Sequence, residues 1–392
     1  MTRIALLTTG RQDWGILHST ATAIRAHPDL ELQLVVGGMH LDRRHGHTVD
    51  GIRADGFEPD DLIPWLADEP DGSLTAAAAR QAAAALDRIG TCLRADPPDA
   101  LLLAGDRFET AAAALAATLE RVPLIHVHGG EQTSGAFDDA LRHAITKLSH
   151  LHLVSHEEHA RRVVAMGEDP ASVHVVGAPG LDAALRPDLP DRAELAADLG
   201  LPLDPPLIIV TVHPGTLEAD PIAAARAVVA AMDAVPATYV VTLPNADPGS
   251  DAVREVLIPL AERPGRVVLE ALGERRYWGL LRIADAMLGN SSSALIEAPA
   301  VDLPAVDVGD RQAGRRAGPN VRHVPADADQ VAAALRSALD PVTRAAIAAA
   351  HPPLADGRAG ARIADIIAAW RPPSPPRKPP IEVPESPPRR SS

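Results

Sequence analysis

A series of short, uninterrupted apolar segments restricts the fold of this chain more than any other feature. Each segment lacks the polar alternation of a half-exposed strand and ends in glycine or a polar turn, as in RIALLTTG, DALLLAGD and VPLIHVHGG, and later in PLIIVTVHPG, TYVVTLPN and DAMLGNSSS. Alanine-rich stretches with helical spacing separate the segments. Strands of this kind are typical of parallel sheets that helices cover on both faces. The pattern therefore predicts an α/β protein.

The chain is too long for one core, and its texture changes near the middle. Single cores stop growing well below 392 residues, so two domains are expected. After residue 177 the sequence becomes dense in proline and aspartate, which indicates a linker and one short helix. A second series of apolar segments follows. We predict two doubly wound Rossmann-like domains that face a cleft, with residues 1–178 in the first and 179–355 in the second.

The C-terminal part of the chain is expected to contribute one helix and a tail. The segment GRAGARIADIIAAW, within 356–370, places Ile363, Ile366 and Ile367 on one face, so we expect this helix to pack back on the core. Residues 371–392 contain nine prolines among 22 positions and should be disordered. A proline-rich ligand for a partner domain is the less favoured interpretation.

Charge and cysteine content exclude several classes of partner. The formal net charge of −15 repels nucleic acid and anionic lipid, and the chain has no run of Lys and Arg except at its C-terminal end. Cys92 is the single cysteine and cannot form an internal disulfide, which favours a reducing cytoplasm. The first apolar run is too short for a signal peptide, and the longer alanine-rich ones are interrupted by Arg or Asp. We expect a cytoplasmic protein that binds neither nucleic acid nor membrane.

Polar residues follow the predicted strands of the first half, where open parallel sheets bind ligands. In TTGRQDWG, Gly10 allows a tight turn and Arg11 offers a forked donor to phosphate, although a plain surface turn is equally consistent. In LLLAGDRFE, Asp106 lies at the strand tip, and Arg107 beside it would keep one carboxylate charged. Glu109 fits the simpler role of complementing the N-terminus of the next helix.

Two histidines at the next strand raise the possibility of a metal site. The alternation of a strand would direct His126 and His128 to the same face, and some zinc hydrolases hold their metal with such a pair. A metal-dependent hydrolase is therefore a real alternative. No third ligand stands out, and His156 and His159 have i,i+3 spacing rather than the i,i+4 spacing of a helical zinc pair.

Acidic residues after the same strand indicate proton transfer chemistry instead. Two glycines let the backbone approach a ligand closely, and Glu131 follows them directly. Asp138, Asp139, Arg142 and His143 fall on the next turns. Clustered carboxylates beside a histidine push their pKa values apart, so that one group can act as an acid and another as a base near neutrality.

The most specific signal in the second half is GNSSSALIEAP. Gly289 ends a strand, and Ser291, Ser292 and Ser293 open a predicted helix, where hydroxyls, free N–H groups and the helix dipole favour an anion. One serine would suffice as a cap, so three of them predict a diphosphate site. Glu297 lies one turn further on and could hold ribose hydroxyls.

Other polar positions of the second half are weaker candidates. His213 in TVHPGT lies at a strand end, but a lone histidine before proline is more often structural than catalytic. Asn245 belongs to a turn whose own chemistry would explain it. Arg311, Arg315 and Arg316 cluster after a later strand, which is informative in so acidic a chain.

Together these motifs resemble those of the hydrolysing UDP-N-acetylglucosamine 2-epimerases of sialic acid and related nonulosonic acid pathways. The matching segments keep the family order from about residue 3 to residue 320: TTGRQDWGIL, GDRFE, HVHGGEQTSGAFDDALRHAITKLSHLHLVS, VGAPGLD, VHPGT, LPNADPGSD, GNSSSALIEAP and VGDRQAGR. The resemblance implies a glycosyltransferase-B architecture, with UDP held mainly by the C-terminal domain and the sugar facing the N-terminal one. It also implies a homodimer or homotetramer that needs no metal and no cofactor.

The resemblance also assigns roles to residues by motif position. Those expected to bind the UDP-sugar are Arg11, Arg107, Asn245, Ser291, Ser292, Ser293, Glu297 and Arg311. Those expected to act on the sugar are Asp106, His128, Glu131, Asp138 and His213. Family members from animals carry a glutamate where this chain has His128, whereas Glu131 matches a second glutamate of the motif. The identity of the second acid or base is therefore open between His128 and Glu131.

The implied reaction is anti elimination of UDP, which leaves a glycal, followed by addition of water with inversion at C2. It needs a base and an acid at C2, and fixed donors for the leaving diphosphate. The substrate is UDP-N-acetylglucosamine or UDP-N,N'-diacetylbacillosamine, which the motifs do not distinguish. Alternatives are a non-hydrolysing 2-epimerase, whose GTRPE and HVEAG motifs are missing here, a retaining glycosyltransferase, and a UDP-sugar sensor without activity.

Overall fold

The structure, a computed structural model, describes most of the chain in two compact units. The described residues are 1–43, 46–66, 74–132, 138–215, 220–244, 249–270, 272–313, 315, 317–350, 356–378 and 380. Unit 1 comprises Met1–Pro179 together with the chain from Arg358 onward, and unit 2 comprises Gly180–Gly357.

A parallel sheet forms the centre of unit 1, with its described strands in the order β3-β2-β1-β4-β5-β6-β7. The strands are β1 (Thr2–Thr8), β2 (Leu30–Gly37), β3 (Asp61–Ile63), β4 (Ala100–Ala104), β5 (Leu124–Val127), β6 (Leu151–Val154) and β7 (Val173–Val175). The order reverses between β1 and β4. The carboxyl ends of these two neighbours therefore form the topological switch point at which open α/β sheets bind ligands.

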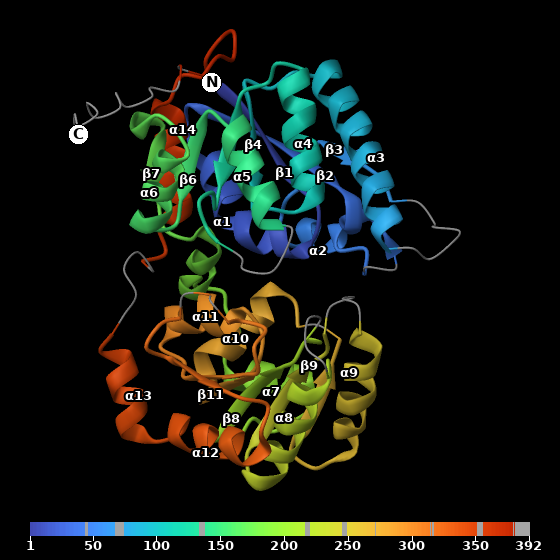
Figure 1. Ribbon diagram of the computed structural model, residues 1–392, viewed down its shortest axis with the longest axis vertical. Coiled ribbons are helices and arrows are strands. Elements are labelled where there is room, and N and C mark those ends of the chain that lie inside the picture. The colour runs from blue at the N-terminus through green and yellow to red at the C-terminus, as the bar shows by residue number, and fades with distance from the viewer. Residues whose placement is uncertain are drawn as a thin grey trace, which may run out of the picture. The chain divides into compact units, whose positions relative to one another are not determined.

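Helices cover both faces of this sheet (Figure 1). They are α1 (Arg11–Ala26), α2 (Val49–Ala54), α3 (Leu74–Ala95), α4 (Phe108–Leu119), α5 (Asp138–Leu148), α6 (Glu157–Ala165) and α14 (Ala359–Ala369). Alternate residues of β1 serve the two faces: Ile4 and Leu6 join the core beneath α1 and α14, whereas Ala5 and Leu7 join the core beneath α3 and α4. Helix α14, red in Figure 1, packs on α1 although the two lie far apart in the sequence.

Unit 2 repeats this arrangement around a second parallel sheet, whose described strands follow the order β10-β9-β8-β11-β12-β13. The strands are β8 (Leu207–Thr211), β9 (Thr238–Thr242), β10 (Arg266–Leu269), β11 (Ala286–Gly289), β12 (Ala305–Val308) and β13 (Val321–Val324). The helices are α7 (Arg192–Leu199), α8 (Ala223–Ala234), α9 (Ser250–Leu257), α10 (Glu274–Ile283), α11 (Ser293–Ile296), α12 (Ala328–Ala338) and α13 (Pro341–Ala348). Here the switch point lies between β8 and β11.

The predicted fold class is confirmed, because both sheets are parallel, doubly wound and flanked by helices. Two local features differ from expectation. The edge strand β3 has only three residues and carries no apolar run long enough to reveal it. Helix α11 is a single turn that passes into the 3₁₀ helix Ala298–Val301, because Pro299 cannot continue an α-helix at that point.

The chain beyond α14 packs on unit 1 as far as it is described. Residues 371–378 form neither helix nor strand, yet the Lys378 Nζ pairs with the buried Glu168 and donates to the Lys147 carbonyl oxygen at 2.8 Å. Glu168 also accepts from Lys147 at 2.5 Å and bonds His152 at 3.0 Å. None of the described helices has the length and apolar character needed to cross a bilayer.

Candidate active site

Arg142 is the centre of a charged network in unit 1. It lies on α5, four residues after Asp138, and is almost fully buried. Its Nη2 donates to the carboxylate of Asp106, which follows β4. Its Nη1 donates to Glu131 Oε2 at 3.3 Å and to the His128 carbonyl oxygen at 3.0 Å. One fixed cation thus holds two carboxylates from the loops that follow β4 and β5.

Glu131 is the most heavily bonded carboxylate of this network. Its Oε1 lies 2.6 Å from His128 Nδ1 and accepts from Ser155 Oγ at 3.0 Å. The Ser155 Oγ lies in turn 2.9 Å from His159 Nδ1. Burial raises the pKa of Glu131, but the charge and hydrogen bond of His128, with further help from Arg142, outweigh burial and hold this pKa well below its usual range. The carboxylate is therefore ionised at neutral pH.

The predicted same-face pair of His126 and His128 is wrong. Strand β5 ends at Val127, and His128 has a φ of +65°, so the alternation of the strand does not extend to it. His126 is fully buried, with Nε2 2.9 Å from the Gly105 carbonyl oxygen and Nδ1 3.2 Å from Thr146 Oγ1. Burial lowers the pKa of His126 to about 3. With both ring nitrogens engaged, His126 is a neutral structural residue and is poorly suited to bind a metal.

Arg107 pairs with Glu109 and not with Asp106, a choice between carboxylates that the sequence left open. Its Nη2 and Nε donate to the two Glu109 oxygens at 2.9 and 3.2 Å. Arg142 takes the predicted role beside Asp106. The same region holds a buried carboxylate that the sequence did not single out, Asp13, which accepts from the Thr9 backbone N at 3.0 Å. Burial raises the pKa of Asp13.

Asp138 begins α5 in a mixed electrostatic environment. Burial and then the neighbouring Asp106 raise the pKa of Asp138, while Arg107 and Arg142 act in the opposite direction. A carboxylic acid with a raised pKa can donate a proton closer to neutrality than an exposed one. Asp138 therefore differs from Glu131, whose environment favours the charge.

Asn290 organises the switch point of unit 2. Its Oδ1 accepts from the His213 backbone N at 2.7 Å, and its Nδ2 donates to the His213 carbonyl oxygen at 2.9 Å. These two bonds join the loop after β8 to the loop after β11. Gly289 precedes Asn290 with a φ of +139°, and a Cβ there would lie 1.9 Å from the Thr211 carbonyl oxygen. The close approach of the two strand ends requires glycine at this position.

The serine cluster is present, but the helix it opens is too short for the expected dipole. Because α11 is a single turn, its aligned peptides contribute less than a full helix would. Ser293 is buried and lies within hydrogen-bond distance of the Tyr277 hydroxyl. Ser291 Oγ accepts from the Ser293 backbone N at 3.3 Å. The anion-binding potential therefore rests on side-chain hydroxyls and loop N–H groups rather than on a helix dipole.

Glu297 lies close to the same serines in a low-polarity environment. Burial raises the pKa of Glu297, although Ser293 and Arg315 oppose the shift. Its Oε2 meets no hydrogen-bond partner within the described part of the chain. A buried carboxyl oxygen without a partner costs free energy. A hydroxyl-bearing ligand could satisfy it.

Arg311 and Gln312 bring further donors to Asn290. Arg311 Nη1 donates to the Asn290 carbonyl oxygen at 3.1 Å, and Gln312 Nε2 donates to the same oxygen at 2.8 Å. Arg315 Nη1 donates to Gln312 Oε1 at 3.1 Å. The predicted cluster of basic side chains after β12 therefore adjoins the serine loop. Arg316, the third member of that cluster, lies outside the described residues.

Arg11 and Asn245 are the two remaining predicted ligand-binding positions. Arg11 is the first residue of α1 and is exposed at the switch point of unit 1. Asn245 lies outside the described residues.

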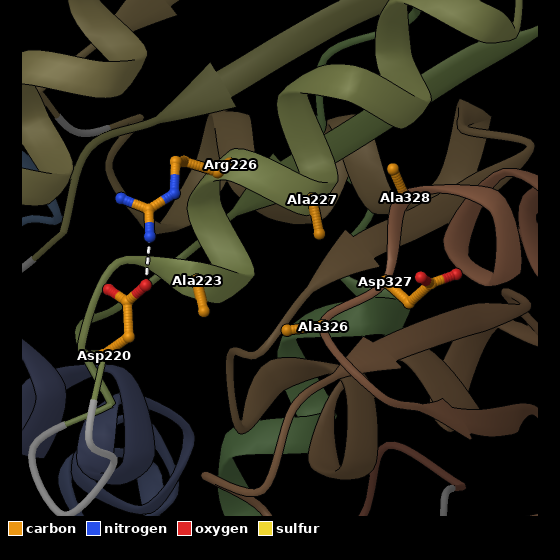
Figure 2. Close-up of a pocket in the computed structure, with 7 residues that line it drawn as sticks. All are labelled: Asp220, Ala223, Arg226, Ala227, Ala326, Asp327 and Ala328. Atoms are coloured by element: carbon orange, nitrogen blue, oxygen red, sulfur yellow. Dashed lines mark hydrogen bonds and ion pairs between the residues drawn. The ribbon is translucent and has the colours of Figure 1, made fainter.

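A hollow in unit 2 contains none of the predicted site residues (Figure 2). It encloses about 390 Å³ and lies at the beginnings of α8 and α12. Figure 2 shows Arg226 directed at Asp220, with which it forms an ion pair, and four alanines that line the rest together with Asp327. Asp327 caps α12 by accepting from the Gln330 backbone N. The charged side chains that line the hollow are therefore already engaged, Arg226 and Asp220 with each other and Asp327 with the N-terminus of α12.

Sequence reasoning missed several participants in the networks, including Gln312, which donates to the Asn290 carbonyl oxygen. Ser155 and His159 bond each other and support Glu131, and Tyr277 contacts Ser293. Ser155 ends the segment HVHGGEQTSGAFDDALRHAITKLSHLHLVS, but nothing in that segment marked it as a site residue, and Tyr277 belongs to none of the motifs. Arg142 could have been identified as central, because its i,i+4 spacing from Asp138 places both on one face of a helix.

Known proteins of one family match most of the chain. A sequence model of the UDP-N-acetylglucosamine 2-epimerase family matches residues 22–368. The UDP-N,N'-diacetylbacillosamine 2-epimerase (hydrolyzing) of Legionella pneumophila is 35% identical over 340 residues, which cover 86% of this chain and 89% of the relative. The UDP-N-acetylglucosamine 2-epimerase of Neisseria meningitidis serogroup B is 32% identical over 341 residues, which cover 86% and 88%.

The fold is also shared with solved structures. A putative UDP-N-acetylglucosamine 2-epimerase from Listeria monocytogenes superposes with a TM-score of 0.78 and 20% identity, covering 94% of this chain and 96% of its own. At this identity the likeness shows the fold alone. The two Rossmann-like units are thus those of the glycosyltransferase-B type.

Proposed function

Because the chain belongs to the UDP-N-acetylglucosamine 2-epimerase family, we propose that it hydrolyses a UDP-linked 2-acetamido sugar with inversion at C2. The products are UDP and a free mannose-type 2-acetamido sugar. The relative from Legionella pneumophila carries the word "hydrolyzing" in its name, which favours hydrolysis over a UDP-retaining epimerisation. The sugar is N-acetylglucosamine or N,N'-diacetylbacillosamine, since both types of relative match at similar identity.

The observation that supports this proposal most directly is the joint contact of Arg142 with Asp106 and Glu131. Elimination of UDP needs a base that takes the C2 proton while the bond from C1 to the diphosphate breaks. Addition of water then needs an acid that returns a proton to the other face of C2. A buried cation that holds two acidic groups from neighbouring loops supplies such a pair, with Asp106 as one member and Glu131 or His128 as the other.

The remaining candidates take positioning roles in the proposal. Asp138 orients the sugar or activates the water, which its raised pKa and its place beside Asp106 support. His213 assists the departure of UDP, since Asn290 fixes its backbone on both sides. Arg107, bound to Glu109, and Arg11 complete the residues of unit 1 that we assign to substrate binding.

Unit 2 holds the nucleotide in this proposal. Ser291, Ser292, Ser293 and Arg311 bind the diphosphate, and Glu297 binds the ribose hydroxyls. The concentration of donors around Asn290 supports this role, because hydroxyl, amide and guanidinium donors stabilise a leaving diphosphate as its charge grows. Asn245 remains a proposed substrate contact from its motif position. We also propose a cytoplasmic homodimer or homotetramer without metal or cofactor, on the family resemblance.

Incubation with each UDP-sugar in D₂O, followed by NMR, tests the reaction. We expect free UDP and a free sugar deuterated at C2. Deuterium at C2 of an intact UDP-sugar would instead indicate a non-hydrolysing epimerase. Binding of the UDP-sugar without either change would indicate a sensor and would overturn the proposal.

The variant Asp106→Asn separates chemistry from binding. It should lower UDP release by roughly 10²- to 10⁴-fold, the usual contribution of a general acid or base, and leave UDP affinity in calorimetry nearly unchanged. The matched control is Asp50→Asn, whose side chain is 69% exposed. Full activity in Asp106→Asn would remove this residue from the mechanism.

The double variant Ser292→Ala, Arg311→Ala tests the nucleotide site. It should weaken UDP binding by roughly 10- to 100-fold, because each charge-assisted bond contributes about 1.5–3 kcal/mol and part of the loss is compensated by water. Arg336→Ala, on α12 of the same unit, is the control. Unchanged UDP affinity in the double variant would exclude this loop as the diphosphate site.

A further inference from the structure

The hydrogen bonds around Glu131 indicate which of its neighbours can exchange a proton with a ligand. Glu131 Oε1 receives His128 Nδ1 and Ser155 Oγ, at 2.6 and 3.0 Å, and Oε2 receives Arg142 Nη1 at 3.3 Å. Both carboxylate oxygens therefore already accept from the protein. A carboxylate that is held ionised by several donors is a poor proton carrier, because protonation would cost it these bonds. Its geometry suits an orienting role.

Counting hydrogens defines the tautomers of the neighbouring groups. Ser155 has one hydroxyl hydrogen, which it donates to Glu131. The nitrogen of His159 that lies 2.9 Å from Ser155 Oγ must then donate its own hydrogen to that oxygen. In the same way, His128 Nδ1 faces a carboxylate and must carry a hydrogen. The remaining ring nitrogen of His128, Nε2, is left to exchange protons with a ligand.

The backbone of His128 is fixed as firmly as its ring. Its carbonyl oxygen accepts from Arg142, and its backbone N donates to the Leu153 carbonyl oxygen at 3.1 Å. The φ of +65° turns the residue out of β5. The side chain is 14% exposed, so the ring is held in place yet remains accessible. An imidazole oriented by a carboxylate at Nδ1 is the arrangement that lets Nε2 act as an acid or base.

We infer that His128 is the acid that returns a proton to C2, and that Glu131, Ser155 and His159 are its positioning residues. This inference rests on the proposed hydrolysing epimerase function. Asp106 takes the C2 proton while C1=C2 forms and the C1–O electron pair leaves with UDP. The imidazolium of His128 then gives its Nε2 proton to the opposite face of C2. Water adds its oxygen to C1 and its released proton returns to His128 Nε2, while Asp106 loses to solvent the proton that it took from C2.

The groups that face His128 are known from each neighbouring element. Glu131, after β5, contacts the ring of His128, and Arg142 of α5 donates to its carbonyl oxygen. His159 of α6 lies 4.0 Å from Glu131, and Asp106, after β4, is bonded to Arg142. Because Arg142 is itself bonded to both carboxylates, its charge is largely balanced locally.

The positive φ of His128 allows an unusually clean set of variants. Glycine and asparagine both tolerate this backbone conformation, so neither substitution strains the loop. In His128→Asn the amide nitrogen can replace Nδ1 as the donor to Glu131, but it carries no exchangeable acid proton. In His128→Gly the missing ring leaves space for added imidazole. His143→Asn, on α5, is the matched control because His143 pairs with Asp139 and not with this network.

Each variant should separate the two half-reactions. His128→Asn should release UDP within a few-fold of wild type but accumulate the glycal instead of the free sugar, as its vinyl proton signal in NMR would show. Added imidazole should restore sugar formation to His128→Gly and leave His143→Asn and wild type unchanged. Glu131→Gln and Ser155→Ala should raise the glycal fraction less than His128→Asn. A larger glycal fraction in Glu131→Gln, or no imidazole rescue, would overturn the assignment.

A measurement that needs no turnover keeps this inference distinct from the proposed function. In ¹⁵N NMR of the resting protein, His128 should show a protonated Nδ1, assigned by its loss in His128→Asn. Ser155→Ala should increase the fraction of the other tautomer. A resting His128 with hydrogen only on Nε2 would overturn the inference. Absence of UDP release by wild type would instead contradict the proposed function, whatever the tautomer.

Discussion

Unit 1 and unit 2 both place their candidate residues at the carboxyl ends of neighbouring parallel strands but hold them with different forces. In unit 1 the loops after β4 and β5 are joined by ion pairs through Arg142, Asp106 and Glu131. In unit 2 the loops after β8 and β11 are joined by the neutral amide of Asn290 and by the close backbone contact at Gly289. Charge dominates the first network and neutral hydrogen bonds dominate the second.

This difference matches two different chemical tasks. Proton exchange at a carbon needs groups whose pKa values are separated, and opposed charges in a partly buried site separate them. Binding of a diphosphate needs donors without nearby ionised carboxylates, since these would repel it. The two glutamates differ accordingly, because burial raises the pKa of Glu297, whereas His128 and Arg142 lower the pKa of Glu131. The comparison predicts how each unit should respond to substitution.

The largest effect is expected for Arg142→Met. This change leaves Asp106 and Glu131 without their shared cation, and removal of one partner from a buried ion pair typically costs roughly 3–5 kcal/mol. The free energy of unfolding in urea should fall by that amount. Arg94→Met is the control, because Arg94 is 67% exposed in its pair with Glu120 and should change little. Equal, small losses in both variants would mean that charge does not hold the network of unit 1.

A somewhat smaller effect is expected for Gly289→Ala in unit 2. The new Cβ would meet the Thr211 carbonyl oxygen at 1.9 Å, so the strand ends must separate. We expect a loss of roughly 3 kcal/mol from backbone strain and overpacking, with weaker UDP binding in calorimetry. Gly200→Ala, at the C-terminal cap of α7 in the same unit, also has a positive φ, of +63° in the left-handed region, but meets no atom within 4 Å, so it should lose only about 1 kcal/mol. Similar losses in the two variants would show that the close approach at Gly289 is unimportant.

The central strands were predictable from sequence because a strand that is buried on both faces consists almost entirely of apolar residues. Strands β8 and β4 are fully buried and read as continuous apolar runs. The edge strand β3 was not predictable, since one of its three residues is charged and another is exposed. The length of α11 was missed because the serines indicate where a helix begins but not where it ends. The position of Pro299 indicates where the α-helix must end.

For the candidate site, the sequence identified which residues gather but not how they pair. Asp106, Glu131 and His128 follow neighbouring strands, so the topology brings their loops together. Which carboxylate Arg107 would select depends on side-chain geometry, and it pairs with Glu109. The metal alternative failed for a similar reason, because the left-handed backbone of His128 breaks the strand alternation on which it depended.

The smallest effect, and the one most specific to the comparison, concerns the pH dependence of Glu297→Gln. The folded-state pKa of Glu297 is raised above its ordinary value of 4.5 by burial, so its contribution to stability is present below that value and is lost as pH rises through the folded pKa. The glutamine variant avoids this loss. In urea unfolding it should therefore match wild type near pH 4, become slightly more stable than wild type at neutral pH, and bind UDP more weakly. Glu131→Gln should show the opposite sign, because the lowered pKa of Glu131 stabilises the fold above its ordinary range and that stability is lost as pH falls. If both variants shift stability in the same direction at neutral pH, the contrast between a charged network in unit 1 and a neutral one in unit 2 is wrong.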